Sequence, residues 1–260
     1  MGINNRNYNT SDPTVEYVKP QRATIQVGDR ALNMAKVYGY LFLALLFTGG
    51  IAFGVGYLFS LWMAHDIAIE ATGYRGGMIA ILMVSAVGLL ILSFVVHGVA
   101  FRNKHSVLPY YIAYVLLMGT LLSTFTMFID WRILGVAFGI TSLVIGLDAV
   151  IALFAKSNFN WVAMMGLSLL LGAGLVFLFS WLMILLFPGV FGPILYIIDF
   201  VVFVAIVLLT LVDIVRITKI AEQGEMTNNL ALYCSFIIYT DFIYIFIRIV
   251  YYIAIFSNRR

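Results

Sequence analysis

Four aspartates fall inside long apolar stretches of the chain, where an ionised side chain is costly. They are Asp148, Asp199, Asp213 and Asp241. An ionised Asp at the centre of a bilayer costs about 2.5–3.5 kcal/mol on insertion scales, so each of these residues needs a partner or water. Carboxylate oxygens are hard ligands of the kind that Ca²⁺ takes, and they also exchange protons. The residue types therefore indicate proton or cation chemistry.

Asp213 and Asp241 lie on the last two apolar stretches, which a short linker joins. Consecutive antiparallel helices usually pack together, so these two carboxyls could meet. Two carboxylates in a poorly hydrated site cannot both ionise cheaply, so one holds a proton and the pair titrates as a unit. Such a dyad would sense pH, closed while it shares a proton and pushed apart when both acids are charged. Alternatively, each Asp is satisfied separately, Asp213 by Arg216 or by interfacial water.

The other two acids have simpler candidate partners. Arg248 follows Asp241 by seven residues, about 10.5 Å along a helix, which is too far for a direct pair. Arg248 either extends toward the interface or meets Asp199, and we favour a structural ion pair with Asp199. Asp148 lies about two turns from the end of its apolar stretch. It either lines the pore or vestibule beside the dyad, or it reaches Lys156 or the interface.

Composition indicates where the elements that carry these acids must lie. The 260 residues are 63% hydrophobic and only 10% charged, and the mean hydropathy is +1.04. A soluble domain carries roughly 25% charged residues to cover its surface. The solvent around this chain is therefore lipid, and a net charge of +3 is too small to indicate a nucleic-acid partner. A single cysteine, Cys234, excludes an internal disulfide.

Seven apolar runs predict an all-α integral membrane protein with seven transmembrane helices in one domain, residues 36–260. Residues 1–35 are polar and are interpreted as a cytosolic tail, with a helical lead-in near Val27–Ala35. Each run is long enough to cross a hydrocarbon core of about 30 Å as a helix. The runs are Val37–Met63, Gly77–Phe101, Val107–Ile129, Ile133–Ala155, Trp161–Phe187, Val190–Ile214 and Leu230–Phe256.

The distribution of basic residues predicts the orientation. Ten Lys and Arg residues fall on the amino-terminal side of the predicted spans and four on the other side. Because basic loops remain in the cytosol, the amino terminus is expected there and the carboxyl terminus outside. Arg259 and Arg260 would then lie outside, so a re-entrant last segment with both termini cytosolic is the alternative. We favour a full crossing because Leu230–Phe256 is long and contains no Pro or Gly.

Three short motifs resemble one known family. Tyr239–Phe246, with the sequence YTDFIYIF, looks like the last-helix signature of the Bax inhibitor family, the transmembrane BAX inhibitor motif proteins. Thr210–Asp213, followed by Arg216, resembles the aspartate-bearing end of that family's sixth helix. Ala137–Ser142 and the short basic loop after it are similar to the fourth span. The resemblance covers roughly residues 30 to 256.

The resemblance implies a fold and an activity. Seven helices are expected, with the last one central in the bundle. A pH-sensitive calcium leak is implied, governed by a pair of aspartates that correspond here to Asp213 and Asp241 and would hold Ca²⁺ transiently. An Arg near the cytosolic end of the second helix holds that pair closed in the family, and Arg102 is the matching residue. A bacterial-type member would lie in the plasma (inner) membrane.

Two other functions compete with the calcium leak. The first is a non-conducting binding protein that modulates a membrane protease or a cell-death or stress partner. The second is an intramembrane aspartyl protease, which pairs Tyr-Asp with Gly-x-Gly-Asp. The runs Tyr239-Thr240-Asp241 and Gly146-Leu147-Asp148 match neither element, so no enzyme is expected. The expected partners are the lipid bilayer, Ca²⁺ and protons. Ca²⁺ is expected only as a permeant ion, with no bound cofactor.

Overall fold

The computed structural model describes residues 27–68, 73–102, 106–154, 192–222 and 226–257. These residues form long α-helices joined by turns, without any strand. Helices are the expected result, because lipid offers no partners to backbone groups and the hydrogen bonds must close within each segment. The described helices are α1 (Val27–Ala68), α2 (Gly73–Arg102), α3 (Leu108–Phe128), α4 (Trp131–Phe154), α6 (Gly192–Ala221) and α7 (Asn228–Ser257).

All six described helices are long and apolar enough to cross a membrane. They correspond to six of the seven predicted spans. The remaining prediction, the span Trp161–Phe187, lies outside the described residues. The first helix begins at Val27, so the lead-in predicted near Val27–Ala35 is helical and continuous with the first span. Residues 1–26 of that tail lie outside the described residues.

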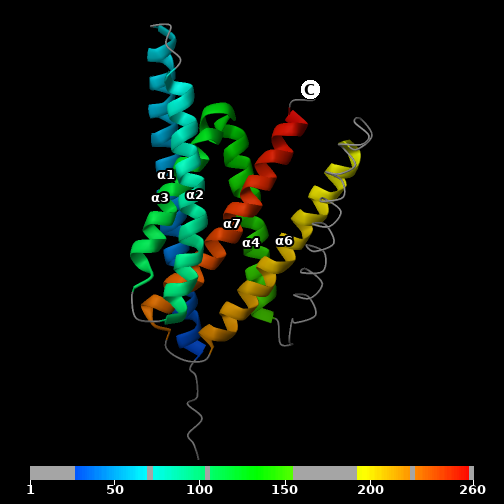
Figure 1. Ribbon diagram of the computed structural model, residues 1–260. Coiled ribbons are helices and arrows are strands. Elements are labelled where there is room, and N and C mark those ends of the chain that lie inside the picture. Colours follow the sequence, from blue (N-terminus) through cyan, green and yellow to red (C-terminus); the bar gives the residue numbers. More distant parts are fainter. Residues whose placement is uncertain (1–26, 69–72, 103–105, 155–191, 223–225, 258–260) are drawn as a thin grey trace, which may run out of the picture.

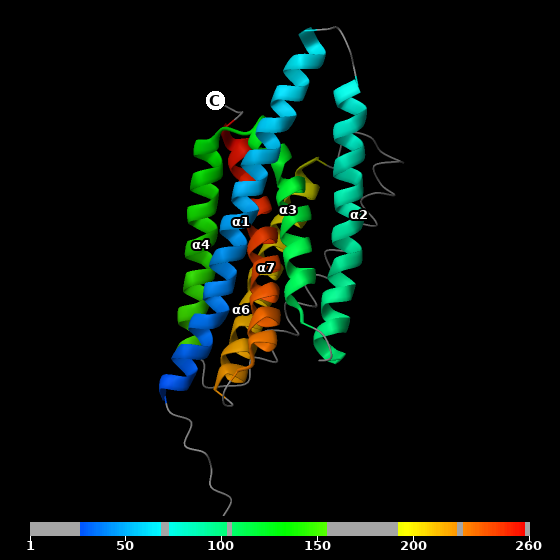
Figure 2. The ribbon, with the colours of Figure 1, turned by 90° about the vertical axis from the view of Figure 1, so that its left-hand side faces the viewer.

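The last helix, α7, is the central one among those described. It contacts each of the other five, whereas α1 and α4 do not contact each other. In its most apolar window 56% of residues are buried, against 17 to 39% in the other five helices. Figure 1 shows α7 crossing the bundle between α6 on one side and α1, α2 and α3 on the other, and Figure 2 shows α4 and α2 at opposite edges.

The helix ends divide between two sides of the bundle. We call the side where α1 and α7 begin the proximal end, and the opposite side the distal end (Figure 1). Helix α4 ends at the proximal end and α6 begins at the distal end. Helix α7 is continuous over 30 residues and runs from the proximal to the distal end, so it is not a re-entrant hairpin. At 1.5 Å per residue its length is about 45 Å, enough to cross the hydrocarbon core.

An aromatic cluster fixes α3 against α7. The rings of Tyr111 and Tyr114 on α3 meet those of Phe236 and Tyr239 on α7 edge to face, with centroids 4.9 to 6.1 Å apart. The buried Tyr239 hydroxyl lies 2.7 Å from the Thr48 hydroxyl on α1. Edge-to-face pairs add to the energy of apolar burial, and the hydrogen bond removes the cost of burying a hydroxyl. The cluster therefore holds α7 in one rotational position.

Gly119 allows α3 to approach α1 closely. A Cβ at this position would lie 2.8 Å from Ile51 Cβ and 3.0 Å from the Thr48 carbonyl oxygen. Small residues at such crossings let helix backbones pack together in membranes.

Replacing Gly119 with alanine should therefore destabilise the bundle. The added methyl group must push α3 away from α1, and overpacking of this kind costs about 1–3 kcal/mol. We expect a lower apparent melting temperature for the purified G119A protein in detergent. The matched control is Gly98→Ala on α2, where an added Cβ meets nothing within 4 Å. Equal melting temperatures for the two variants would show that this close approach does not matter.

Candidate functional site

The central feature of the site is Asp241, near the midpoint of the most buried helix. Its Oδ2 atom is inaccessible to solvent and has no hydrogen-bond partner among the described residues. The Thr210 side chain of α6 forms a hydrogen bond with this carboxyl group. Asp213 and Asp148 both act on it electrostatically. Helix α7 thus places an incompletely satisfied carboxyl group in the interior, next to two further acids.

The second acid, Asp213, is shared between two interactions. It lies one turn after Thr210 on α6, on the same face of that helix. Its carboxylate accepts a hydrogen bond from Arg216 on the same helix at 3.4 Å, and it also acts electrostatically on Asp241. The structure therefore contains both interactions: Arg216 pairs with Asp213, and Asp213 also lies within electrostatic range of Asp241. The Arg216 pair is weak because the guanidinium is 63% exposed and the contact is long.

Asp148 brings a third acid to the same region from α4. Its side chain is nearly fully buried, at 6% exposure, and one carboxyl oxygen has no partner among the described residues. The Tyr38 hydroxyl of α1 is also buried and unpaired within the described part of the chain, and it interacts electrostatically with Asp148. Four helices therefore direct polar groups into one apolar interior. We call Tyr38, Asp148, Asp213 and Asp241 the acidic cluster.

The acidic cluster is not arranged as a metal centre. Within the described residues, no group of three or more His, Cys, Asp or Glu side chains could hold a metal ion. A resident Ca²⁺ site takes six to eight oxygen ligands, which this set does not supply. Chemically, the cluster can hold protons, attract a cation and order water.

The residue matched to the family's arginine ends α2. Arg102 is the last residue of that helix, but its side chain lies outside the described residues. Its helix reaches α7 through His97, whose ring meets Tyr233 and Phe236 edge to face at 5.7 and 6.0 Å.

At the distal end a separate network joins α6 to α7. Arg248 forms an ion pair with Asp199 Oδ1. The Tyr252 hydroxyl donates a hydrogen bond to Asp199 Oδ2 at 2.7 Å. Both oxygens of Asp199 are therefore occupied, and we call these three residues the distal clasp. The structure brings Asp199 together with Arg248 and keeps both apart from the acidic cluster.

At the proximal end, residues that the sequence did not single out hold the helix termini. Asn33 of α1 is buried; its amide donates to the Ala221 carbonyl at 3.1 Å and its Oδ1 accepts from the Met226 amide at 3.2 Å. Arg30 forms an ion pair with Glu222 at 2.7 Å. The start of α1 therefore caps the end of α6 and ties it to the start of α7.

Two members of the site were also missed by the sequence. Tyr38 carried no signal, because aromatic residues in spans are usually core or interface anchors. Thr210 had a detectable signal, since it lies three residues before Asp213 and helical periodicity places both on one face. A hydroxyl at that spacing from an intramembrane acid is a reasonable pattern to search for in related chains.

The distal clasp yields a stability prediction. Asp199→Asn keeps an acceptor for Tyr252 but leaves Arg248 without its counter-ion in a half-buried position. We expect a loss of about 1–3 kcal/mol, below the 3–5 kcal/mol of a fully buried pair because both groups retain some exposure.

A double-mutant cycle in detergent checks this prediction. The double variant D199N/R248Q should lose less stability than the sum of the two single variants, because it removes both charges together. Strictly additive melting-temperature changes would show that the two groups do not interact.

Comparison with known proteins places this arrangement in a family. The family model described as "Bax1-I: Inhibitor of apoptosis-promoting Bax1" matches residues 30–258, which is most of the chain. The comparison with curated proteins and that with solved structures found no match. The matched region contains all six described spans and the whole acidic cluster. The chain is an integral membrane protein and belongs to the Bax inhibitor family.

Proposed function

We propose that this protein is a pH-sensitive leak channel for calcium and similar cations, and that a proton shared by Asp213 and Asp241 gates it. One observation carries the proposal. The buried, incompletely satisfied carboxyl group of Asp241 lies on the central helix and within electrostatic range of Asp213 on the neighbouring helix α6. Intramembrane acids that face the interior of a bundle typically mark ion pathways or proton relays.

Thr210 suits a shared proton. Its hydroxyl donates to the Ile206 carbonyl at 3.0 Å, so its single hydrogen is already in use. A proton on Asp241 can be donated to the Thr210 oxygen or to Asp213, but not to both at once. When it is held between the two carboxyls, it gives a partner to Asp241 Oδ2, which is otherwise buried and unpaired. This closed state keeps α6 and α7 in contact through the site.

Loss of that proton would drive the opening. As the pH rises, both aspartates become negative, and two like charges in a poorly hydrated site repel each other strongly. The nearby charges decide the net effect: Arg216 on α6 offsets part of the charge on Asp213, whereas Asp148 on α4 adds to the repulsion. His97 on α2 also faces α7, where its ring meets Tyr233 and Phe236. Cation flux is therefore expected to increase with pH.

A permeant ion suits the ligand set better than a resident one does. Two or three carboxylates attract Ca²⁺, but without a complete coordination shell they bind it weakly. Conduction needs sites that favour entry and still release the ion. We further propose that Arg102 holds the pair closed and that the proximal end, with Arg30, Lys36 and Lys219, faces the cytosol of a bacterial cell.

Neutralising either member of the dyad should abolish the pH response. We expect flux through the wild-type protein in proteoliposomes to increase across roughly pH 6 to 8, because loss of the shared proton leaves two repelling charges. Asp213→Asn and Asp241→Asn should each give a flat profile, because the amide keeps the hydrogen-bonding shape but cannot ionise. A fluorescent calcium indicator inside the vesicles measures the flux.

Asp130→Asn is the matched control for that experiment. Asp130 is an exposed acid at the distal turn, and its Oδ1 accepts a hydrogen bond from the Arg132 amide, which an asparagine can preserve. If both dyad variants keep the wild-type rate and pH response, the gating proposal is wrong. If the folded wild-type protein conducts nothing, the alternative of a binding protein for a membrane protease or stress partner gains support, and a pull-down would test it.

Asp148 should affect the rate more than the gating. Asp148→Asn removes one negative charge near the route but leaves the dyad intact, so the cation attraction decreases and the pH profile keeps its shape. We expect a several-fold slower flux in the same vesicle assay, with a pH midpoint shifted to lower pH because Asp148 no longer adds to the repulsion. A normal rate would exclude Asp148 from the route, and a flat pH profile would instead place it within the gating pair.

A further inference from the structure

An apolar groove separates α1 from α4 on the side of the bundle away from α6. These two helices do not contact each other, and α3 and α7 form the floor between them. The groove has a volume of about 490 Å³, and its lining is apolar except for Thr48 and Thr126. Both hydroxyls are already bonded, Thr48 to Tyr239 and Thr126 to the Ala52 carbonyl. The groove therefore offers a mainly hydrocarbon surface in which both threonine hydroxyls already have partners.

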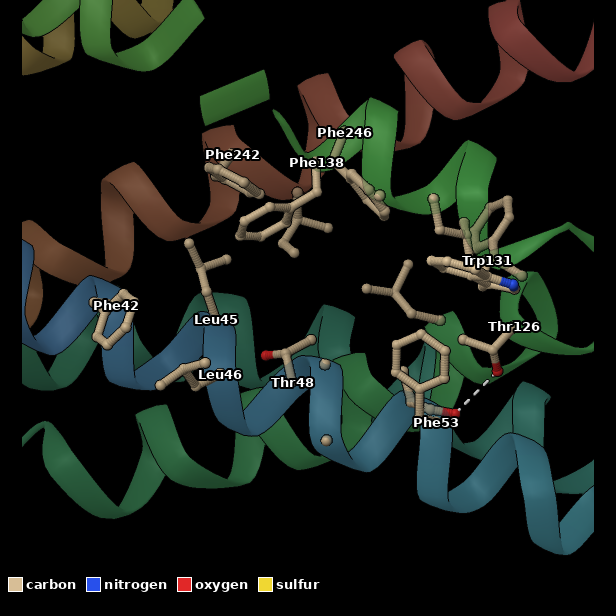
Figure 3. Close-up of a pocket in the computed structure, with 18 residues that line it drawn as sticks. Phe42, Leu45, Leu46, Thr48, Phe53, Thr126, Trp131, Phe138, Phe242 and Phe246 are labelled. Carbon is tan, nitrogen blue, oxygen red and sulfur yellow. Dashed lines mark hydrogen bonds between the residues drawn. The ribbon is translucent and has the colours of Figure 1, made fainter. Parts of the chain in front are cut away.

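The groove has the length of one leaflet. Figure 3 shows Phe42 at one end and Trp131 at the other, with Leu45 facing Phe138 and Phe242 across the space. From Phe42 to Phe53 the lining follows α1 for about 16 Å at 1.5 Å per residue. This is about half of a ~30 Å hydrocarbon core. Because these helices span the membrane, the solvent at the groove is hydrocarbon rather than water.

A polar hollow adjoins the distal end of the groove. It is lined by residues 126–132, with a mostly polar lining, and it shares Thr126 and Trp131 with the groove. Arg132 is exposed there, with its guanidinium 5.8 Å from the centre of the Trp131 ring. Asp130 is the acid at this turn, and its Oδ1 accepts a hydrogen bond from the Arg132 backbone amide. Trp and Arg are the residues that anchor a span at the headgroup level.

We propose that the groove and the hollow together form a binding site for one phospholipid, with an acyl chain between α1 and α4 and the phosphate group at Arg132. The occupant follows from the shape: a long apolar trough that ends in a polar hollow, where Arg132 is the cation and Asp130 the acid, matches an amphiphile oriented as the lipids of the distal leaflet are. Arg is well suited to phosphate because its planar fork donates two parallel hydrogen bonds. This proposal does not depend on the cation leak.

Two glycines in the lining provide a sharp test. Gly135 on α4 and Gly50 on α1 both line the groove, and a Cβ at either position meets nothing within 4 Å. Leucine at these positions should therefore fill the groove without a backbone clash. Gly139 on α4 and Gly39 on α1 are equally open but lie outside the lining, so their leucine variants are matched controls.

The experiment is a lipid titration of the full-length protein in a mild detergent, followed by native mass spectrometry. The probes are a long-chain phosphatidylglycerol, glycerol 3-phosphate as a headgroup without tails, and diacylglycerol as tails without phosphate. We expect one saturable phosphatidylglycerol site in the wild-type protein. G135L and G50L should each weaken it about tenfold or more, a change of about 1.4 kcal/mol in binding. G139L and G39L should bind as the wild type does.

Arg132→Gln separates the two halves of the site. It should weaken phosphatidylglycerol but leave the weaker binding of diacylglycerol unchanged. The proposal is wrong if G135L and G50L, eluting as monodisperse protein, bind phosphatidylglycerol as tightly as their controls. It is also wrong if glycerol 3-phosphate binds as well as the whole lipid, since the site would then recognise free phosphate. Because G135L and G50L change different helices, α4 and α1, the test remains valid if one of the two variants does not fold.

Discussion

Lipid provides no hydrogen bonds, and this constraint acts most strongly on α7. As the most buried helix described, it must find protein partners for every polar group that it carries into the interior. Tyr239 finds Thr48 and Ser235 finds Tyr111. Asp241 is the exception, because one of its oxygens stays buried without a partner among the described residues. An unpaired buried acid is expensive, so it is the natural place for a moving proton or a passing cation.

The rest of the bundle holds this group between two fixed ends. The distal clasp joins α6 to α7 through both oxygens of Asp199. At the proximal end, Asn33 and the Arg30–Glu222 pair join α1 to the end of α6. The acidic cluster lies between these attachments, where Asp213 of α6 comes within electrostatic range of Asp241 of α7. Repulsion there would act on a short, central length of the helix pair rather than separate the helices completely.

The α1–α4 groove illustrates a second consequence of the lipid environment, which concerns apolar rather than polar side chains. Apolar side chains lose nothing by facing lipid, so a bundle in a membrane can leave a trough open that a soluble protein would have to fill. Phe242 lines that trough and directly follows Asp241 in α7. The interior that contains the acidic cluster and the lipid-facing groove are therefore lined by neighbouring faces of one helix.

The sequence by itself determined the class of protein and most of the spans, because a continuous run of apolar residues admits only a helix in lipid. It also marked the four aspartates, since charge in such a run is detectable without any structure. It further indicated the lead-in near Val27–Ala35, where α1 begins, but it did not show that Asn33 in this segment binds the α6–α7 connection, a contact between residues far apart in the chain. Only the tertiary structure brought Tyr38 within electrostatic range of Asp148. It also brought Asp213 within electrostatic range of Asp241 while Asp213 remains paired with Arg216. The groove between α1 and α4 is a third outcome of the tertiary structure. Those outcomes depend on how each helix is rotated against its neighbours, and side-chain packing across helices sets that rotation, which periodicity along one helix does not encode.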